Sequence, residues 1–226
     1  MASKILIPKL HPRDFTFPNP LDANQEGLLA WGGDLKPERL LRAYTKGIFP
    51  WFNEGDPILW WSPDPRLVLF PSDIKISKSL AKSMKHFDIR YDTAFENVMR
   101  QCLETRLAQG QKSWISEDLI ASFCALHVEG FAHCVECYYE KKLVGGLYGL
   151  YLGGVFCGES MFSTKRDASK AALVGLCEKV KSLGGDFIDC QLPTDHLQSL
   201  GACVIEREKF LGMLENALEN CKTKPW

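Results

Sequence analysis

Apolar and polar positions follow a regular pattern from about residue 68 onward. Apolar side chains recur at helical spacing over residues 77–86, 93–110 and 116–130, so we expect three helices there. Thr93 opens a capping-box pattern, and Ser116 directly precedes the first turn of the third helix. Both hydroxyl groups are therefore expected to cap their helices.

The next part of the chain has the spacing of strands, with runs at residues 131–139, 143–152 and 155–162. Gly153 and Gly154 are typical of a hairpin turn between the last two runs. The elements expected after them are a helix over 167–183 capped by Asp167, a strand over 186–191, a short helix near Leu197, a strand over 203–206 and a helix from about Lys209. This order indicates an α+β fold with a mixed, mostly antiparallel sheet flanked by helices.

The first 66 residues differ from the rest of the chain. They contain four of the six tryptophans and no cysteine, and proline and glycine occur throughout. Pro37 suits the first position of a short helix, and Gly47 suits its end. We therefore predict two domains, a small irregular N-terminal domain over residues 1–66 and a larger domain over residues 67–226.

Composition narrows the class of protein. The 226 residues are 46% hydrophobic, which excludes a disordered chain. No apolar run approaches the roughly 18 residues that a membrane helix needs. The first ten residues lack the apolar core of a secretory signal, and the nine cysteines are an odd number without the spacing of a disulfide framework. We therefore expect a cytoplasmic protein that does not associate with membranes.

Cys134 and Cys137 have the spacing of half a zinc site, but no second pair stands at the expected distance along the chain. Both residues lie inside the predicted strand over 131–139. We interpret them as structural thiols and expect no metal.

Charge is distributed unevenly along the chain. The net charge of −1, taken alone, argues against a nucleic-acid partner. Residues 1–90 nevertheless carry 13 basic and 10 acidic side chains, whereas residues 91–226 carry 14 and 18. Four lysines at helical spacing are expected to share one face, namely Lys75, Lys78, Lys82 and Lys85. This face favours an anionic partner such as a phosphate backbone, and a solvated helix face is the alternative.

Two acidic residues stand inside apolar strands. In the strand over 186–191, Asp189 and Gln191 are expected to project to the same face. A buried carboxylate needs a partner, so Asp189 either bonds to a neighbour structurally or faces a cavity. In a cavity, a carboxylate beside an amide is suited to act as a general base for an amine. Glu159, on one strand face with Met161, is the second such carboxylate.

Several other catalytic patterns are absent from the sequence. It contains no Gly-x-Ser-x-Gly elbow, no pair of histidines at zinc-helix spacing, no phosphate loop and no dinucleotide fingerprint. The segment from Met161 to Asp167 also lacks the glycine-rich turn that would bind the pyrophosphate of coenzyme A. This absence argues against acetyl-CoA as a substrate.

Seven segments of the chain are long and specific enough to suggest a family. They are residues 26–35 (EGLLAWGGDL), 47–52 (GIFPWF), 57–66 (PILWWSPDPR), 143–149 (LVGGLYG), 156–163 (FCGESMFS), 188–191 (IDCQ) and 199–202 (SLGA). Taken in order, they resemble the leucyl/phenylalanyl-tRNA–protein transferase family. The resemblance extends from about Phe15 to about Phe210, which is nearly the whole chain.

The resemblance implies a fold and a reaction. The larger domain should be related to N-acetyltransferases. The chain should transfer leucine or phenylalanine, and methionine less well, from Leu-tRNA or Phe-tRNA to the α-amino group of proteins that begin with Arg or Lys. These proteins are thereby marked for degradation by the N-end rule pathway. Because the aminoacyl ester is already activated, the reaction needs no cofactor, metal or covalent enzyme intermediate. A monomer is also expected from the family.

The resemblance also assigns roles to individual residues. Asp189, with Gln191, should polarise the attacking amine. Trp51 and Trp114 should flank the terminal adenosine of the tRNA. The four lysines become candidates for contact with the acceptor stem. The aminoacyl side chain should lie in a pocket lined by Leu147, Phe156, Glu159, Met161, Leu173 and Ile188.

Two alternatives to an aminoacyl-tRNA–protein transferase remain at this point. One is an N-acetyltransferase that uses acetyl-CoA, which the missing pyrophosphate loop disfavours. The other is a non-enzymatic tRNA-binding module, which would keep the lysine face and the two tryptophans but would not need Asp189.

Overall fold

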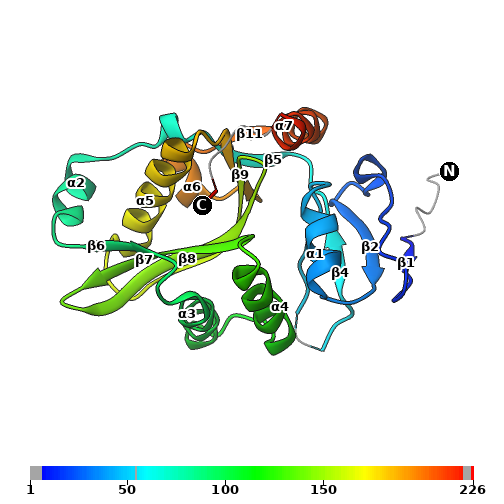
Figure 1. Cartoon of the computed structure of the whole chain (residues 1–226), viewed down its shortest axis with the longest axis horizontal. Coiled ribbons are helices and arrows are strands. Elements are labelled where there is room, and N and C mark those ends of the chain that lie inside the picture. Colours follow the sequence, from blue (N-terminus) through cyan, green and yellow to red (C-terminus); the bar gives the residue numbers. More distant parts are fainter. Residues whose placement is uncertain (1–6, 54, 221–224) are drawn as a thin grey trace.

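The computed structural model describes residues 7–53, 55–220 and 225–226. A small sheet and a large sheet lie at opposite ends of the molecule (Figure 1). The small sheet has the strand order β1-β2-β4-β3, and helix α1 (Pro37–Tyr44) accompanies it. Its strands are β1 (Lys9–Leu10), β2 (Leu28–Gly32), β3 (Phe49–Pro50) and β4 (Leu59–Trp61).

The large sheet has the strand order β11-β5-β10-β9-β8-β7-β6. Strands β9 and β10 pair in parallel, whereas the other neighbours pair antiparallel. The strands are β5 (Arg66–Leu69), β6 (Asp88–Tyr91), β7 (Ala132–Tyr139), β8 (Lys142–Leu152), β9 (Val155–Ser163), β10 (Phe187–Gln191) and β11 (Cys203–Ile205). The predicted α+β fold with a mixed, mostly antiparallel sheet is therefore confirmed.

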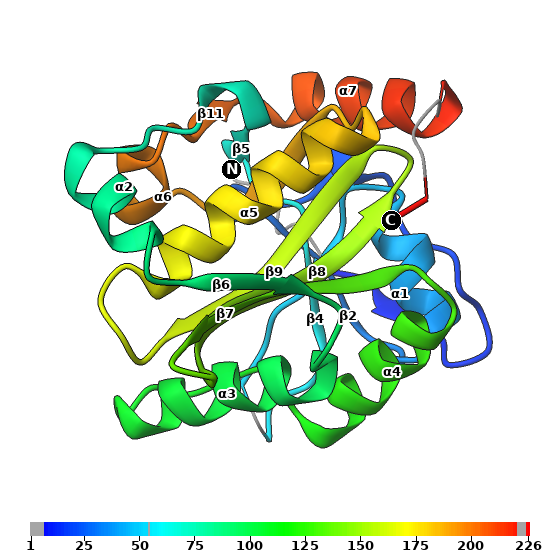
Figure 2. The ribbon, with the colours of Figure 1, turned by 60° about the vertical axis from the view of Figure 1, so that its left-hand side comes forward.

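Helices cover both faces of the large sheet (Figure 2). Helix α5 (Ala168–Leu183) packs on β7, β8 and β9 and contacts α2 (Lys78–Met84). Helices α3 (Phe95–Ala108) and α4 (Glu117–Val128) pack on the opposite face. The remaining short or terminal helices are η1 (Pro20–Asp22), η2 (Pro71–Asp73), α6 (Asp195–Ser199) and α7 (Arg207–Glu219). None of the helices in the described part of the chain is long and apolar enough to cross a membrane.

The alternation of side chains along the strands divides the hydrophobic core in two. On β7, Cys134 packs into the cluster under α3 and α4, whereas Val135 packs into the cluster under α5. The first cluster continues into the small sheet, where Trp60 is fully buried and donates from Nε1 to the carbonyl of Gly32. The ring of Tyr44 on α1 meets Phe123 on α4 at 6.4 Å, so the two ends of the molecule share one core.

Of the helix caps predicted at Ser116 and Thr93, the structure forms only the one at Ser116. The cap at Ser116 is confirmed, because its Oγ accepts a hydrogen bond from the N–H of Leu119. The cap at Thr93 is wrong, because Ala94 occupies the N-cap position and the Thr93 hydroxyl donates to Glu136 on β7. The buried Glu136 carboxylate also accepts the N–H groups of Thr93 and Ala94, so a distant strand residue caps α3.

The predicted cap at Asp167 is wrong in a similar way. Asp167 stands at the N-cap position of α5 with a left-handed φ of 68°, but its side chain makes no capping bond. Its carboxylate accepts a hydrogen bond from the hydroxyl of Ser83 on α2 and lies 3.5 Å from Nζ of Lys170. Asp167 therefore ties α2 to the start of α5.

The predicted division into residues 1–66 and 67–226 stays a prediction. All four strands of the small sheet precede Arg66, which is itself the first residue of β5 in the large sheet. Contacts also connect the two parts, since Arg207 of α7 donates to the carbonyl of Ser62 and, through its N–H, to the carboxylate of Asp64.

Candidate active site

A cavity of about 430 Å³ opens between β3, the end of α3, strands β8, β9 and β10, and helices α5 and α6. Its volume is in the range of small-molecule sites. The lining includes all six residues predicted for the aminoacyl pocket, together with the predicted residues Gln191, Trp51 and Trp114; the six are Leu147, Phe156, Glu159, Met161, Leu173 and Ile188. The structure thus brings nine predicted residues together, while their binding roles stay predictions.

The register of the large sheet explains why the apolar lining converges. Leu147 on β8 pairs directly with Met161 on β9, and Phe156 on β9 pairs with Ile188 on β10. Directly paired residues project to the same face of a sheet. Leu173 on α5 also lines the cavity, so an apolar wall forms from three strands and one helix.

Glu159 and Gln191 form the polar part of this wall. Nε2 of Gln191 donates to Oε1 of Glu159 at 2.8 Å, and the Glu159 side chain is buried. Burial raises the pKa of Glu159 from 4.5 to about 7, while the Tyr44 hydroxyl and the Gln191 amide act in the opposite direction. The carboxyl group of Glu159 therefore changes its charge near neutral pH, and it lies in the wall of the cavity, where it can contact a bound ligand.

Asp189 does not line the cavity. It is 1% exposed and forms a two-point ion pair with Arg66, in which Nε donates to Oδ1 at 2.8 Å and Nη2 donates to Oδ2 at 2.7 Å. Oδ1 also accepts the N–H of Gln191. Of the two interpretations left open by the sequence, the geometry favours a structurally bonded carboxylate, because both oxygens already have donors.

The Asp189 ion pair sets the conformation of the next residues. β10 has a register irregularity between Asp189 and Gln191, and Gln191 has a left-handed φ of 62°. Such a φ is unfavourable for a residue with a side chain and is found where the surroundings enforce it. The bond from the Gln191 N–H to Asp189 is one such constraint, and it directs the Gln191 amide to Glu159.

Arg66 is a residue of this region that the sequence reasoning did not single out. It is 1% exposed, donates from Nη1 to the carbonyl of Gly47, and places its guanidinium over the rings of Phe49 and Phe210. Its only sequence signal is its place at the end of the proline-rich segment 57–66, which does not reveal a partner 123 residues away.

The two predicted adenosine-flanking tryptophans differ in their surroundings. Trp51 is 41% exposed, and its carbonyl accepts a hydrogen bond from Nε1 of Trp61. Trp114 is half-buried, and the guanidinium of Arg106 lies 4.5 Å from the centre of its ring. Arg106 also lines the cavity but was not predicted, since its position in the last turn of a helix is common for arginine.

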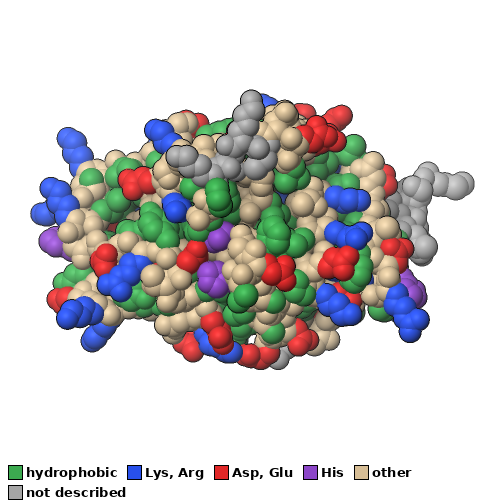
Figure 3. Space-filling model, viewed as in Figure 1, with side chains coloured by type: hydrophobic (Ala, Val, Ile, Leu, Met, Phe, Trp, Pro, Cys, Tyr) green, Lys and Arg blue, Asp and Glu red, His purple; other side chains and the backbone are tan. Residues whose placement is uncertain are grey.

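The predicted lysine face is only partly helical. All four lysines are exposed, but α2 contains only Lys78 and Lys82, and Lys85 is its C-cap. Lys75 lies in the preceding loop and lines a second cavity of about 360 Å³ with Arg166 and Lys170. Lys and Arg side chains project from this end of the molecule in Figure 3, where Figure 1 shows α2. The prediction of one face along one helix is therefore wrong for Lys75, while a basic surface does exist here.

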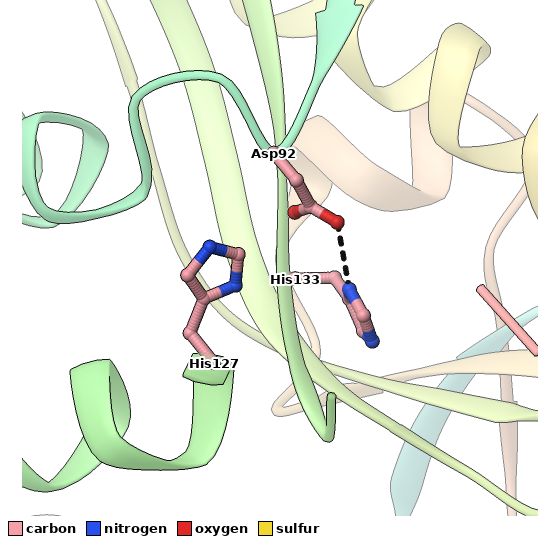
Figure 4. A group of neighbouring side chains, drawn as sticks. All are labelled: Asp92, His127 and His133. Carbon is pink, nitrogen blue, oxygen red and sulfur yellow. Dashed lines mark hydrogen bonds and ion pairs between the residues drawn. The ribbon is translucent and has the colours of Figure 1, made fainter. Parts of the chain in front are cut away.

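A group of possible metal ligands lies apart from the cavity. Asp92, His127 and His133 place ligand atoms within 4.8 Å of one another (Figure 4). Three of these atoms already have protein partners, because Nδ1 of His133 bonds to Asp92, Nε2 of His133 to the carbonyl of Gly130, and Nδ1 of His127 to the carbonyl of Ala132. We therefore interpret the group as one that fixes the loops leading into β7.

The cysteines are free thiols in the described part of the chain, and Cys221 lies outside it. Cys134 and Cys137 are buried on β7, where Cys134 donates to Oε1 of Glu136. Burial raises the pKa of Cys137 to about 12, so this thiol stays protonated at neutral pH.

Comparisons with known proteins cover nearly the whole chain. The model of the leucyl/phenylalanyl-tRNA protein transferase family matches residues 68–215, and the model of the N-terminal domain of the same family matches residues 33–64. A GCN5-related N-acetyltransferase from Kribbella flavida is a more distant structural match, with a TM-score of 0.39 and 12% identity over 72% of this chain and 58% of that chain.

Two curated relatives carry the name leucyl/phenylalanyl-tRNA–protein transferase. The protein from Sulfurimonas denitrificans is 49% identical over 98% of this chain and 97% of its own length. The protein from Legionella pneumophila strain Corby is 51% identical over 91% of this chain and 93% of its own length. The chain therefore belongs to the leucyl/phenylalanyl-tRNA–protein transferase family.

Proposed function

We propose that this protein transfers leucine or phenylalanine, and methionine less well, from aminoacyl-tRNA to the α-amino group of proteins that begin with Arg or Lys. The acceptors would thereby be marked for degradation by the N-end rule pathway. Membership of the family makes the chain an aminoacyltransferase. The observation that carries the proposal is that one cavity combines an apolar wall, the Glu159–Gln191 pair and two tryptophans.

The apolar wall suits the side chain of the donor amino acid. Leu147, Phe156 and Ile188 are almost fully buried and leave room for a flexible or planar apolar group. Each buried methylene of such a side chain contributes about 0.8 kcal/mol. Glu159 stands beside this wall, where its carboxylate form can attract the free amino group of the esterified amino acid.

The transfer itself needs few groups from the protein. The α-amine of the acceptor attacks the ester carbon, a C–N bond forms, and the C–O bond to the tRNA ribose breaks. The amine loses a proton and the ribose oxygen gains one. An α-amine has a pKa of about 8, so only about a tenth of it is neutral at pH 7. Gln191 would orient the amine through its side-chain amide, and Asp189 would act as a positioning residue that holds Gln191.

The basic surface around α2 is proposed to contact the acceptor stem of the tRNA. Lys78, Lys82 and Lys85 are exposed, and Lys75 lines the neighbouring second cavity. Cations on such a surface displace the counterions of a phosphate backbone. Trp51 and Trp114 would stack on the terminal adenosine, which is worth about 1–3 kcal/mol for each base. We further propose a cytoplasmic monomer with domains over residues 1–66 and 67–226.

The proposal is tested by incubating the protein with labelled Leu-tRNA or Phe-tRNA and a peptide that begins with Arg. We expect label on this peptide and on one that begins with Lys, and none on matched peptides that begin with Glu or have an acetylated N-terminus. Binding of tRNA without transfer would support the non-enzymatic alternative. Transfer of acetyl groups from acetyl-CoA without aminoacyl transfer would support the N-acetyltransferase alternative.

A further inference from the structure

Arg106 lines the cavity, and its guanidinium forms no ion pair with a carboxylate of the described residues. Its guanidinium stacks on Trp114 at 4.5 Å, and its Nε is buried with no hydrogen-bond partner among the described residues. A buried donor without an acceptor costs free energy, so such a group points to a ligand that is bound during function. The other arginine near the site, Arg66, is fully occupied by Asp189 and Gly47.

A second unsatisfied polar group lies near Arg106. Tyr148 lines the same cavity, and its buried hydroxyl has no hydrogen-bond partner in the part of the chain that the structure describes. Burial raises the pKa of Tyr148 well above its ordinary value, and the negative charge of Glu159 raises this pKa further, whereas the positive charge of Arg106 lowers it. The phenol keeps its proton and is available as a donor. The cavity lining thus contains two buried donor groups, the Arg106 guanidinium and the Tyr148 hydroxyl, for which the described residues provide no hydrogen-bond acceptor.

The covalent structure of an aminoacyl-tRNA end determines which anion can reach this place. The ribose of the terminal adenosine carries the aminoacyl ester, the adenine base and the 5′-phosphate. In the proposed binding mode the aminoacyl group lies against Glu159 and Gln191, and the adenine base stacks on the indole of Trp114. Because one ribose connects these groups, the 5′-phosphate must then lie within about the length of a ribose from that indole. Arginine can stack on an aromatic face and still direct its N–H donors at a phosphate in the ring's plane.

We propose that Arg106 binds the 5′-phosphate of the terminal adenosine of the aminoacyl-tRNA, with Trp114 holding the guanidinium in place. This inference rests on the proposed function, since it names the group that recognises the donor nucleotide. It assigns to Arg106 a binding role that neither the lysine surface nor the adenosine-flanking tryptophans provide. A phosphate bound there fixes the ribose and so the position of the ester carbon beside Gln191.

The test compares two minimal donors, phenylalanyl-adenosine esterified on the ribose and the same ester carrying a 5′-phosphate. The acceptor is a peptide that begins with Arg, and kcat/KM is measured for both donors. In the wild type we expect the phosphate to raise kcat/KM about tenfold or more, as for a charge-assisted hydrogen bond. In Arg106→Gln the ratio of kcat/KM for the phosphorylated donor to kcat/KM for the unphosphorylated donor should fall to about one. In Arg106→Lys this ratio should take an intermediate value. The control is Arg100→Gln, because Arg100 is on the same helix but pairs with Glu96 and Glu117.

An undiminished phosphate effect in Arg106→Gln, or no phosphate effect in the wild type, would overturn the proposal. A loss of activity toward both donors by the same factor would show that Arg106 only supports Trp114, and would overturn it too. Binding of AMP and adenosine, measured by calorimetry, separates this inference from the proposed function and does not depend on turnover. AMP should bind about tenfold more tightly than adenosine to the wild type. Equal binding would contradict a phosphate site even if the glutamine variant does not fold.

Discussion

The carboxylate of Asp189 and the guanidinium of Arg66 form a buried two-point ion pair that joins β10 to β5. Both side chains are 1% exposed. The pair lies at the strand end where Gln191 turns into the cavity, so Asp189 stands behind Gln191 and not in the cavity lining. The same arginine reaches Gly47 after α1 and thereby connects the small sheet to the site.

Replacement of Arg66 alone should destabilise the folded protein strongly. In Arg66→Leu a charged Asp189 would remain buried without a partner, and we expect the free energy of unfolding to fall by about 3–5 kcal/mol. The free energy of unfolding of Asp189→Leu should fall by a similar amount, because Arg66 would then be the buried charge without a partner. The double variant should recover much of the loss, because neither charge is then stranded. Urea unfolding of the wild type, the two single variants and the double variant gives the coupling free energy between Arg66 and Asp189. If the losses in the two single variants simply add in the double variant, the paired role is contradicted.

Glu159 should make stability depend on pH. Its pKa is raised from 4.5 to about 7 by burial, so between these values the folded protein holds a proton that the unfolded chain has lost. The free energy of unfolding should therefore fall as pH rises through this window, by up to about 3 kcal/mol. Glu159→Gln should remove this part of the slope, whereas Glu104→Gln, at an exposed position, should keep it. An unchanged slope in Glu159→Gln would show that Glu159 ionises normally.

Two facing glycines should respond differently to alanine. Gly149 and Gly158 pair across β8 and β9, but a Cβ on Gly149 would overlap the carbonyl oxygen of Cys157. A Cβ on Gly158 would meet only the carbonyl oxygen of Asp189, at an ordinary 3.5 Å. We expect Gly149→Ala to destabilise the fold by about 1–3 kcal/mol and Gly158→Ala by less than about 1 kcal/mol. Thermal unfolding checks both, and equal losses would contradict the packing described for β8.

The basic surface around α2 should determine the salt dependence of tRNA binding. Each lost phosphate contact lowers the slope of log affinity against log salt concentration by about 0.7–0.9. We expect Lys78→Ala combined with Lys82→Ala to weaken binding and reduce this slope. Lys181→Ala combined with Lys209→Ala removes the same charge from exposed positions outside this surface and should leave the slope unchanged. Equal slopes in the two double variants would place the acceptor stem elsewhere.

Local sequence patterns predicted five of the seven strands of the large sheet, but neither β5 nor β6. The expected helix over 167–183 and strand over 186–191 correspond to α5 and β10, because their apolar spacing and glycine boundaries are local properties. The caps at Thr93 and Asp167 were wrong because each side chain bonds to a residue far along the chain, Glu136 and Ser83 respectively. Tertiary contacts of this kind override the local capping propensity of a side chain.

The candidate site was less predictable from residues alone. The pairing of Leu147 with Met161 and of Phe156 with Ile188 depends on strand register, which periodicity does not supply. The family resemblance, and not residue spacing, grouped these side chains in advance. Arg106 was missed because its significance depends on its stacking with Trp114 and on a donor without a partner, both of which appear only in three dimensions.

The most direct test of the account is the single-turnover rate of leucine transfer from Leu-tRNA to a peptide that begins with Arg, in the wild type and in Gln191→Ala. Gln191 lines the cavity and bonds to Glu159, but its side chain is not part of the core. We expect transfer by the wild type, and a rate at least about tenfold lower in the variant with unchanged unfolding. A variant that transfers leucine as fast as the wild type, or a wild type that transfers none, would contradict the claim that this cavity carries out aminoacyl transfer.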